Sequence, residues 1–194
     1  MVRTRYSTIA ILFHWIIAAL ILINLYLGFR MGLVQGLAKF NIFQLHKSIG
    51  ITVLILSVLR LAWRLVNRPP PEAPGLQPWE RVASLAVHWG FYVIMIGMPL
   101  TGWIVVSTSP LNIPTLLYHT VPWPHFPGVH TLAAGPKTTV NHAFDITHVV
   151  LAWGAVVLLA LHVGAVVKHQ FLDRHPVLGR MLPLGRRARL ATES

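Results

Sequence analysis

The sequence alternates between four long apolar segments and connections that carry most of its polar residues. The apolar segments cover residues 8–28, 45–66, 82–106 and 144–167, and the longest connection covers residues 108–142. Each apolar segment has about the 20 residues that a helix needs to cross the hydrocarbon core of a membrane. The pattern predicts an all-α protein, an integral membrane four-helix bundle that the whole 194-residue chain forms as one domain.

The composition agrees with a membrane environment. Hydrophobic residues make up 55% of the chain and charged residues 11%, and the mean hydropathy is +0.62, whereas a soluble domain carries about 25% charged residues. The net charge of +11 comes from basic residues between the apolar segments, a pattern typical of membrane topology and phospholipid contact rather than nucleic-acid binding. Because the chain has no cysteine, iron–sulfur clusters, thiolate metal sites and disulfides are excluded.

The basic residues also predict the orientation, since cytoplasmic connections of membrane proteins are enriched in lysine and arginine. Four fall on one side of the expected membrane: Arg30, Lys39, Lys47 and Lys137. Twelve fall on the other side: Arg3, Arg5, Arg60, Arg64, Arg68, Arg81, Lys168, Arg174, Arg180, Arg186, Arg187 and Arg189. Both termini should therefore be cytoplasmic in a bacterial inner membrane, with 108–142 as a periplasmic cap. The first apolar segment is too long for a signal peptide, so we expect it to be retained as a helix.

Prolines mark two connections and one helix. The prolines at 69–71 and Pro74 cannot continue a helix and favour an extended chain after the second apolar segment. Six further prolines in 108–142 indicate an ordered cap and not a fifth crossing. Pro99 should kink the third helix, because its ring removes one helical hydrogen bond.

Histidines provide the candidate chemistry. Five of the eleven lie within or at the ends of apolar segments: His14, His46, His88, His148 and His162. An imidazole in hydrocarbon is costly without a partner, which makes such residues candidates for a functional site. The alternative for each of them is a hydrogen bond between helices. His148 and His162 are 14 residues apart, which corresponds to about 21 Å along a helix and to nearly the same helix face.

Matching the depths of these histidines in antiparallel helices gives two pairs. His14 lies early in the first segment at the level of His162, and His46 opens the second segment at the level of His148. Two axial imidazoles from different helices suit a six-coordinate b-type haem, whereas zinc takes four protein ligands, or three and a water. We therefore expect two b-type haems, with His14 and His162 binding iron on the cytoplasmic side and His46 and His148 on the periplasmic side.

Several motifs resemble those of the bacterial cytochrome b561 family, over about residues 5–185. The matching stretches are Tyr6-Ser7, Phe13-His14-Trp15, Leu45-His46-Lys47-Ser48-Ile49-Gly50, Arg60-Leu61-Ala62-Trp63-Arg64, Pro99-Leu100-Thr101-Gly102, Asp145-Ile146-Thr147-His148 and His162. The resemblance implies a di-haem, four-helix membrane cytochrome with the same two histidine pairs as ligands. It further implies electron transfer from a periplasmic donor, such as superoxide, to the quinone pool.

Three further residues are candidates for substrate contact. His88 and His169 are placed to meet ubiquinone or a haem propionate, and His88 is also an alternative haem ligand. Lys47, next to His46, would attract superoxide together with the other periplasmic basic residues, or be an ordinary interfacial lysine. The remaining histidines are expected in loops or at the surface: His119, His125, His130, His142 and His175.

The resemblance thus implies an oxidoreductase that passes electrons from superoxide, or from another periplasmic redox donor, to ubiquinone in the membrane. One alternative is a haem-b anchor subunit that receives electrons from a separate dehydrogenase or hydrogenase and reduces quinone. Another is a non-redox transporter or scaffold whose histidines relay protons or pack between helices. A visible haem spectrum would exclude this last alternative.

Overall fold

The computed structural model describes residues 5–71, 75–175 and 177–182. Within these ranges the chain forms four long helices, a two-stranded hairpin and two short helical turns. Several residues used in the sequence analysis lie outside the described part of the chain: Arg3, Pro74, Arg186, Arg187 and Arg189.

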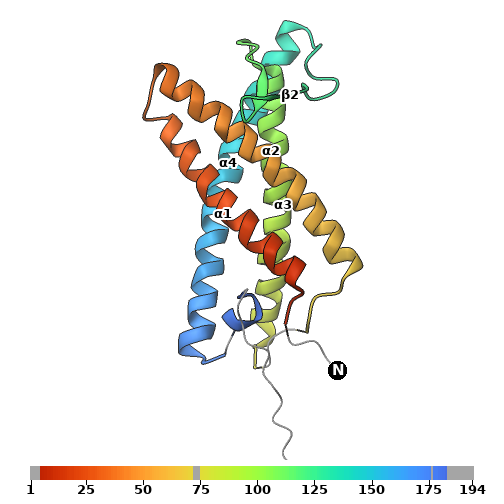
Figure 1. Cartoon of the computed structure of the whole chain (residues 1–194), viewed down its shortest axis with the longest axis vertical. Helices are drawn as coiled ribbons and strands as arrows, with labels where there is room; N and C mark the ends of the chain where they lie inside the picture. The colour runs from red at the N-terminus through yellow and green to blue at the C-terminus, as the bar shows by residue number, and fades with distance from the viewer. Residues whose placement is uncertain (1–4, 72–74, 176, 183–194) are drawn as a thin grey trace, which may run out of the picture.

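Four helices account for most of the structure (Figure 1). Their bounds are α1 Thr8–Met31, α2 Gly36–Val66, α3 Pro78–Thr108 and α4 Ala134–Val167. A π-helical turn, η1 (Lys168–Leu172), extends α4, and a 3₁₀ turn, η2 (Leu178–Arg180), follows it. All four helices are long and apolar enough to cross a membrane, so the predicted all-α membrane bundle is confirmed.

Three helices begin earlier than the apolar segments indicated. α2 begins at Gly36 rather than near residue 45, α3 at Pro78 rather than 82, and α4 at Ala134 rather than 144. The apolar segments identify the part of each helix that suits hydrocarbon, whereas the added turns are more polar and extend beyond it. As a result, the connection between α3 and α4 is shorter than the predicted 108–142. Separately, α1 ends slightly later than its apolar segment, at Met31 rather than residue 28.

The start of α3 has a recognisable signal. Pro78 occupies the first turn, where its missing N–H costs nothing. The Gln77 backbone N–H donates to Glu80 Oε2 at 2.9 Å, and the Gln77 side chain caps the helix in return. Such a reciprocal arrangement satisfies two N–H groups that the first turn would otherwise leave unpaired.

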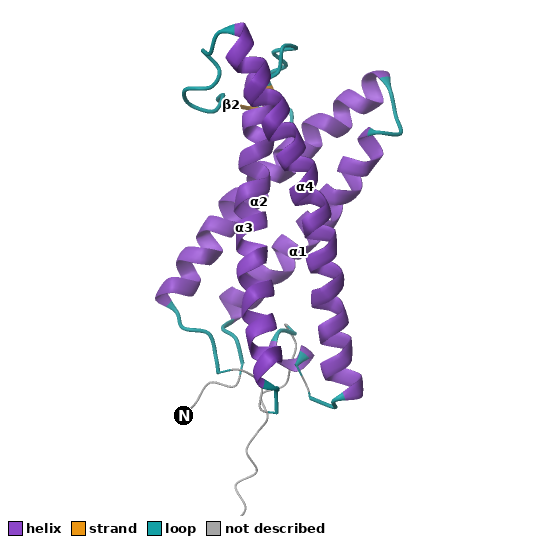
Figure 2. Cartoon of the chain, turned by 180° about the vertical axis from the view of Figure 1, so that it is seen from behind, coloured by secondary structure: helices purple, strands orange, loops and turns teal. Residues whose placement is uncertain are grey.

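The helices form two antiparallel hairpins that lean across each other (Figures 1 and 2). One hairpin is α1 with α2, the other is α3 with α4, and α2 packs against α3 to join them. The start of α1, the α2–α3 connection and the end of α4 lie at one end of the bundle, and the α3–α4 connection lies at the other (Figure 1). Within the described residues, this arrangement separates the two groups of basic residues that the sequence analysis distinguished.

The buried core is small and lies where the hairpins meet. Its centre combines Ile17 and Leu27 of α1, Ile49 and Val53 of α2, and Tyr92 and Met95 of α3. Many large apolar side chains elsewhere on the helices are exposed in the isolated chain. An exposed apolar surface of this kind is expected of helices that face lipid.

The α3–α4 connection contains an antiparallel hairpin that the sequence analysis did not predict. β1 (Thr115–Leu117) pairs with β2 (Val121–Trp123), with Thr115 opposite Trp123. Tyr118 and His119 have φ of 50° and 61°, which is the left-handed conformation of the central residues in a type I′ turn. We call the whole α3–α4 connection, residues 109–133, the cap.

Hydrogen bonds from both hairpins hold the cap in place. The Gln44 side chain of α2 donates to the Pro114 carbonyl at 3.1 Å, and the Tyr118 backbone N–H donates to Ser48 Oγ at 2.9 Å. On the α3 side, the Phe126 N–H donates to Ser107 Oγ at 2.8 Å. The cap is therefore an ordered cover over one end of the bundle, as its prolines indicated.

Candidate haem sites

The helices enclose a large cavity. Its volume is about 1130 Å³, and along α4 its lining extends from Asp145 to Val166, with His169 just beyond the end of the helix. Most lining residues are apolar, and histidines from all four helices are among the exceptions: His14, His46, His88, His148 and His162. A mostly apolar cavity with a few polar groups is typical of a cofactor or ligand site.

The first histidine pair lies at the capped end. His46 of α2 and His148 of α4 face each other with ring centroids 6.2 Å apart. His46 Nδ1 lies 3.1 Å from the Asn24 carbonyl oxygen, and His148 Nδ1 lies 3.0 Å from that of Met98. A carbonyl only accepts, so each Nδ1 carries the proton, and each Nε2 keeps a lone pair for a metal.

Two glycines let neighbouring helices approach these rings. A Cβ atom at Gly102 of α3 would lie 3.0 Å from Cε1 of His148. At Gly28 of α1 it would lie 3.5 Å from Cε1 of His46. The first distance is shorter than ordinary contact, so a larger residue at Gly102 would displace the imidazole.

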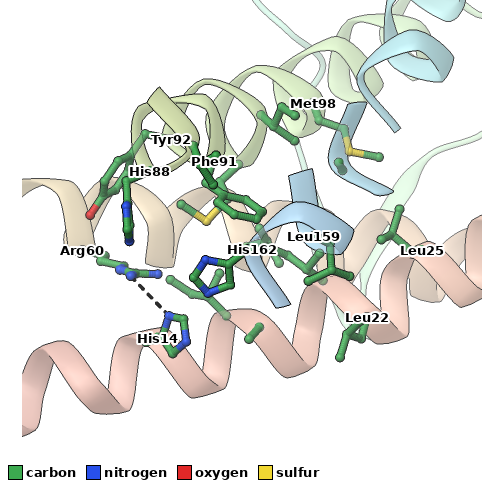
Figure 3. Close-up of a pocket in the computed structure, with 18 of the residues that line it drawn as sticks. His14, Leu22, Leu25, Arg60, His88, Phe91, Tyr92, Met98, Leu159 and His162 are labelled. Atoms are coloured by element: carbon green, nitrogen blue, oxygen red, sulfur yellow. Dashed lines mark hydrogen bonds between the residues drawn. The ribbon is translucent and has the colours of Figure 1, made fainter. Parts of the chain in front are cut away.

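The second pair lies in the other half of the cavity (Figure 3). His14 of α1 and His162 of α4 have ring centroids 6.2 Å apart. His88 of α3 is also close, since its ring centroid lies 5.9 Å from that of His162. The His88 Nδ1 lies 2.6 Å from the Ser84 carbonyl oxygen. The structure thus brings together both pairs expected from depth, and it adds His88 to one of them.

Arg60 is a member of this second cluster that the sequence analysis did not identify. Its guanidinium donates to His14 Nδ1 at 3.4 Å and points into the space between His14 and His88 (Figure 3). The guanidinium also lies 5.8 Å from the Tyr92 ring. The sequence analysis used Arg60 for topology and for the family resemblance, but its position inside an apolar segment could have identified it as a site residue, because a charge there requires a partner.

Lys47 is more enclosed than its sequence position suggested. Its side chain is buried beneath the cap, where Nζ donates to the Pro114 carbonyl at 3.1 Å and lies 4.7 Å from the centre of the Phe43 ring. It also borders the cavity. Lys39 of the same end is exposed, and Lys137 donates to the His130 carbonyl.

His169 lies on η1, at the end opposite the cap. It borders the cavity, and its Nδ1 lies 2.7 Å from Asp173 Oδ2. Lys168 donates to the same Asp173 oxygen and to Glu80 Oε1, both at 2.7 Å. The hydrogen bonds from Lys168 and His169 hold the pKa of Asp173 below its usual range, so this carboxylate is charged at neutral pH.

The histidine pairs fit a bis-histidine iron site. Metal–imidazole bonds are about 2 Å long, and ring centroids 6.2 Å apart leave room for one metal atom between facing nitrogens. The apolar lining suits the macrocycle of a b-type haem, and neutral imidazoles are its usual axial ligands in membrane helix bundles. The residues present therefore fit this cofactor.

Comparison with known proteins identifies the family of the chain. Residues 5–184 match the family model for prokaryotic cytochrome b561. The chain is 31% identical over 185 residues to cytochrome b561 homolog 2 of Escherichia coli K12, which covers 92% of this chain and 91% of that protein. It is 25% identical over 183 residues to probable superoxide oxidase CybB of Yersinia pestis, with 92% and 96% covered. It is also 26% identical over 184 residues to cytochrome b562 of Cereibacter sphaeroides, with 91% and 94% covered.

The family match spans nearly the whole chain and includes all four helices. It also includes the six histidines that border the cavity, and the cap. The chain therefore belongs to the prokaryotic cytochrome b561 family of haem-b, electron-transfer membrane proteins.

Proposed function

We propose that the chain is a superoxide:ubiquinone oxidoreductase that carries electrons across the bacterial inner membrane. Two superoxide anions would each give up one electron at the periplasmic side and leave as dioxygen. One ubiquinone would take up these two electrons and two protons and leave as ubiquinol. The observation that carries the proposal is the presence of two facing histidine pairs at two levels of one apolar cavity.

We assign the iron ligands to these pairs. His46 and His148 would hold a haem on the periplasmic side, and His14 and His162 would hold a second on the cytoplasmic side. When bound, b-type haem supplies reversible one-electron chemistry at a six-coordinate iron. The backbone carbonyls of Asn24 and Met98 keep the periplasmic imidazoles in the tautomer that leaves Nε2 available.

The charge at the capped end supports an anionic donor. Lys47 borders the cavity next to His46, and Arg30, Lys39 and Lys137 belong to the same side of the chain. Positive charge raises the local concentration of a small anion and hence its association rate. Lys47 would act at the end of this approach, because its ammonium group lies beneath the cap and not on the open surface.

The other half of the cavity offers polar groups for a quinone. His88 and His169 both border it, and we assign them to hydrogen bonds with ubiquinone carbonyls or with haem propionates. Arg60 adds a positive charge near His88 (Figure 3), which suits an anionic group in the same half. Ubiquinone is apolar and would enter from the lipid between the helices.

The test is kinetic, on haem-loaded protein in liposomes. Lys47→Gln should slow haem reduction by superoxide about tenfold at low ionic strength, because steering by charge is lost, and should leave reoxidation by a ubiquinone analogue intact. His88→Ala or His169→Ala, with both haems retained, should have the reverse effect. Lys39→Gln is the matched control, since Lys39 is an exposed lysine of the same end.

If Lys47→Gln slowed quinone turnover and spared the superoxide reaction, the assignment of superoxide to the capped end and of quinone to the other end would be reversed. Stable co-purification with a dehydrogenase or hydrogenase, together with no reduction by superoxide, would favour the anchor-subunit alternative instead.

A further inference from the structure

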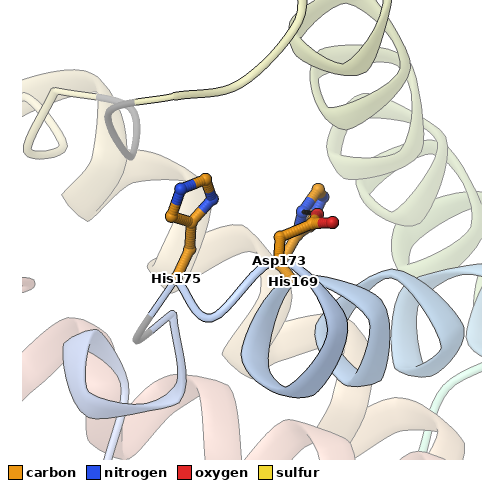
Figure 4. Close-up of side chains that lie close together, drawn as sticks. All are labelled: His169, Asp173 and His175. Carbon is orange, nitrogen blue, oxygen red and sulfur yellow. Dashed lines mark hydrogen bonds and ion pairs between the residues drawn. The ribbon is translucent and has the colours of Figure 1, made fainter.

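The end of the bundle opposite the cap carries a cluster of side chains that electron transfer does not use as a unit. His169, Asp173 and His175 each offer one ligand atom, and these three atoms lie within 4.8 Å of one another. All three side chains project to the same side of the ribbon (Figure 4). All three are half-buried, so the cluster differs from an exposed group of charges on a surface.

We propose that His169, Asp173 and His175 bind one zinc ion. Two imidazoles and one carboxylate are a ligand set that zinc uses, with water completing the coordination. The proposal does not depend on the superoxide or quinone reactions, because its test measures bound metal.

The backbone is shaped to bring His175 back towards the other two residues. Arg174, between Asp173 and His175, has a φ of 56°, a left-handed conformation that a non-glycine residue adopts only at some cost. The His175 backbone N–H donates to the His169 carbonyl at 2.7 Å. This reversal brings His175 back beside His169, whereas six residues of extended chain would span about 20 Å.

The surroundings of the His175 ring also support a bound metal ion. Within the described part of the chain, its buried Nδ1 makes no hydrogen bond. Gly75, in the connection between α2 and α3, leaves room for the ring because it has no Cβ atom. A Cβ atom there would lie only 2.7 Å from His175 Cε1. A buried imidazole nitrogen without a hydrogen bond is unfavourable, and a metal ion would satisfy it.

The charges at the cluster are compatible with a cation. Asp173 accepts hydrogen bonds from both His169 and Lys168, and a metal ion would replace these contacts. Lys168 would keep its ion pair with Glu80, at 2.7 Å. The Nδ1 proton of His169 would move to Nε2 by exchange with solvent, so that the imidazole binds as a neutral ligand.

The test uses haem-loaded protein, so that the four proposed iron ligands, His14, His46, His148 and His162, are occupied. After removal of metals with a chelator, the protein is equilibrated with zinc, and bound zinc per chain is measured by mass spectrometry. We expect one zinc ion per chain in the unmodified protein. The affinity for zinc should be lower by roughly tenfold or more in His169→Ala, His175→Ala and Asp173→Asn. His142→Ala, which removes an exposed histidine of α4, should bind as the unmodified chain does.

A second comparison keeps all three ligands. Gly75→Ala should weaken zinc binding, because its Cβ would displace the His175 ring. Gly128→Ala is the matched control: Gly128 has a φ of +80°, similar to the +87° of Gly75, but nothing within 4 Å of its Cβ position.

A third measurement uses the unmodified chain, so its result does not depend on whether a variant folds. Zinc should protect His169 and His175, but not His142, from acylation by diethyl pyrocarbonate in the unmodified chain. Zinc bound equally well by His175→Ala, or no protection of His169 and His175, would overturn the proposal.

Discussion

The four paired histidines differ in their surroundings. At the capped end, His46 and His148 each donate to a backbone carbonyl, which fixes their tautomer before any metal binds. At the other end, His14 faces the guanidinium of Arg60, and His162 lies against the rings of His88 and Phe91. The second pair thus has a cation, Arg60, and a further histidine, His88, beside it.

The contact between Gly102 and His148 leads to a prediction at a single residue. Gly102→Ala should remove about half of the bound haem, since its Cβ would lie 3.0 Å from Cε1 of His148. Gly97→Ala on the same helix is the control, because its Cβ would meet Leu151 at an ordinary 3.8 Å and alanine favours the helix. The haem-to-protein ratio of the purified variants measures both effects. Equal haem in the two variants would contradict the importance of this contact.

His125 and His130 of the cap form a stacked pair that the sequence analysis treated as separate loop residues. Their ring centroids are 3.9 Å apart and their planes are nearly parallel. Burial, and then the charges of His130, Lys137 and Lys47, lower the pKa of His125 from its ordinary value of 6.5. The folded cap therefore favours neutral His125, whereas the unfolded chain takes up the proton more readily.

The sign of the pH dependence follows. The stack contributes fully above the ordinary pKa of 6.5, and its contribution is lost as the pH falls below that value. The melting temperature should fall more in the unmodified chain than in His125→Gln between about pH 7.5 and about pH 5.5. Parallel curves for the two proteins would show that the stack does not control stability.

At the scale of the elements, the existence of the helices was predictable but their starts were not. Apolar length identifies the part of a helix that suits hydrocarbon, and this part was readable for all four helices. The first turns of α2 and α4 contain polar and small residues, which carry no such signal. The hairpin β1–β2 was missed because its strands have three residues each, too few for an alternating pattern.

The site was predictable to a similar degree. Helical periodicity along α4 and the antiparallel order of the helices were enough to pair His14 with His162 and His46 with His148. What the sequence could not provide was the environment of each group. The burial of Lys47 depends on the cap, and the contact of Arg60 with His14 depends on how the hairpins cross.

The cap allows a direct test of the predicted topology. Gly128 lies in a loop with nothing within 4 Å of its Cβ position, so a fused reporter should be tolerated there. A reporter at Gly128 should indicate the periplasm, and one in the 69–78 connection should indicate the cytoplasm. Both reporters indicating the cytoplasm would contradict a periplasmic cap.

At the scale of the whole molecule, the fold explains how a small chain can provide two separate sites. Each hairpin contributes one histidine to each pair, since His14 and His46 come from α1 and α2 while both of their partners come from α4. The cavity between the hairpins lies beside both pairs. The fold therefore places the two candidate haem sites at two levels of one cavity.

The central claim is that two haems are each held by one of these histidine pairs, and the haem-to-protein ratio of single and double variants tests it most directly. The unmodified chain should bind two haems. His46→Ala, His148→Ala and the double variant of both should each bind one, as should His14→Ala, His162→Ala and their double variant. A double variant that combines one residue from each pair should bind none. A colourless unmodified protein, or loss of a haem in His88→Ala but not in His148→Ala, would contradict the account.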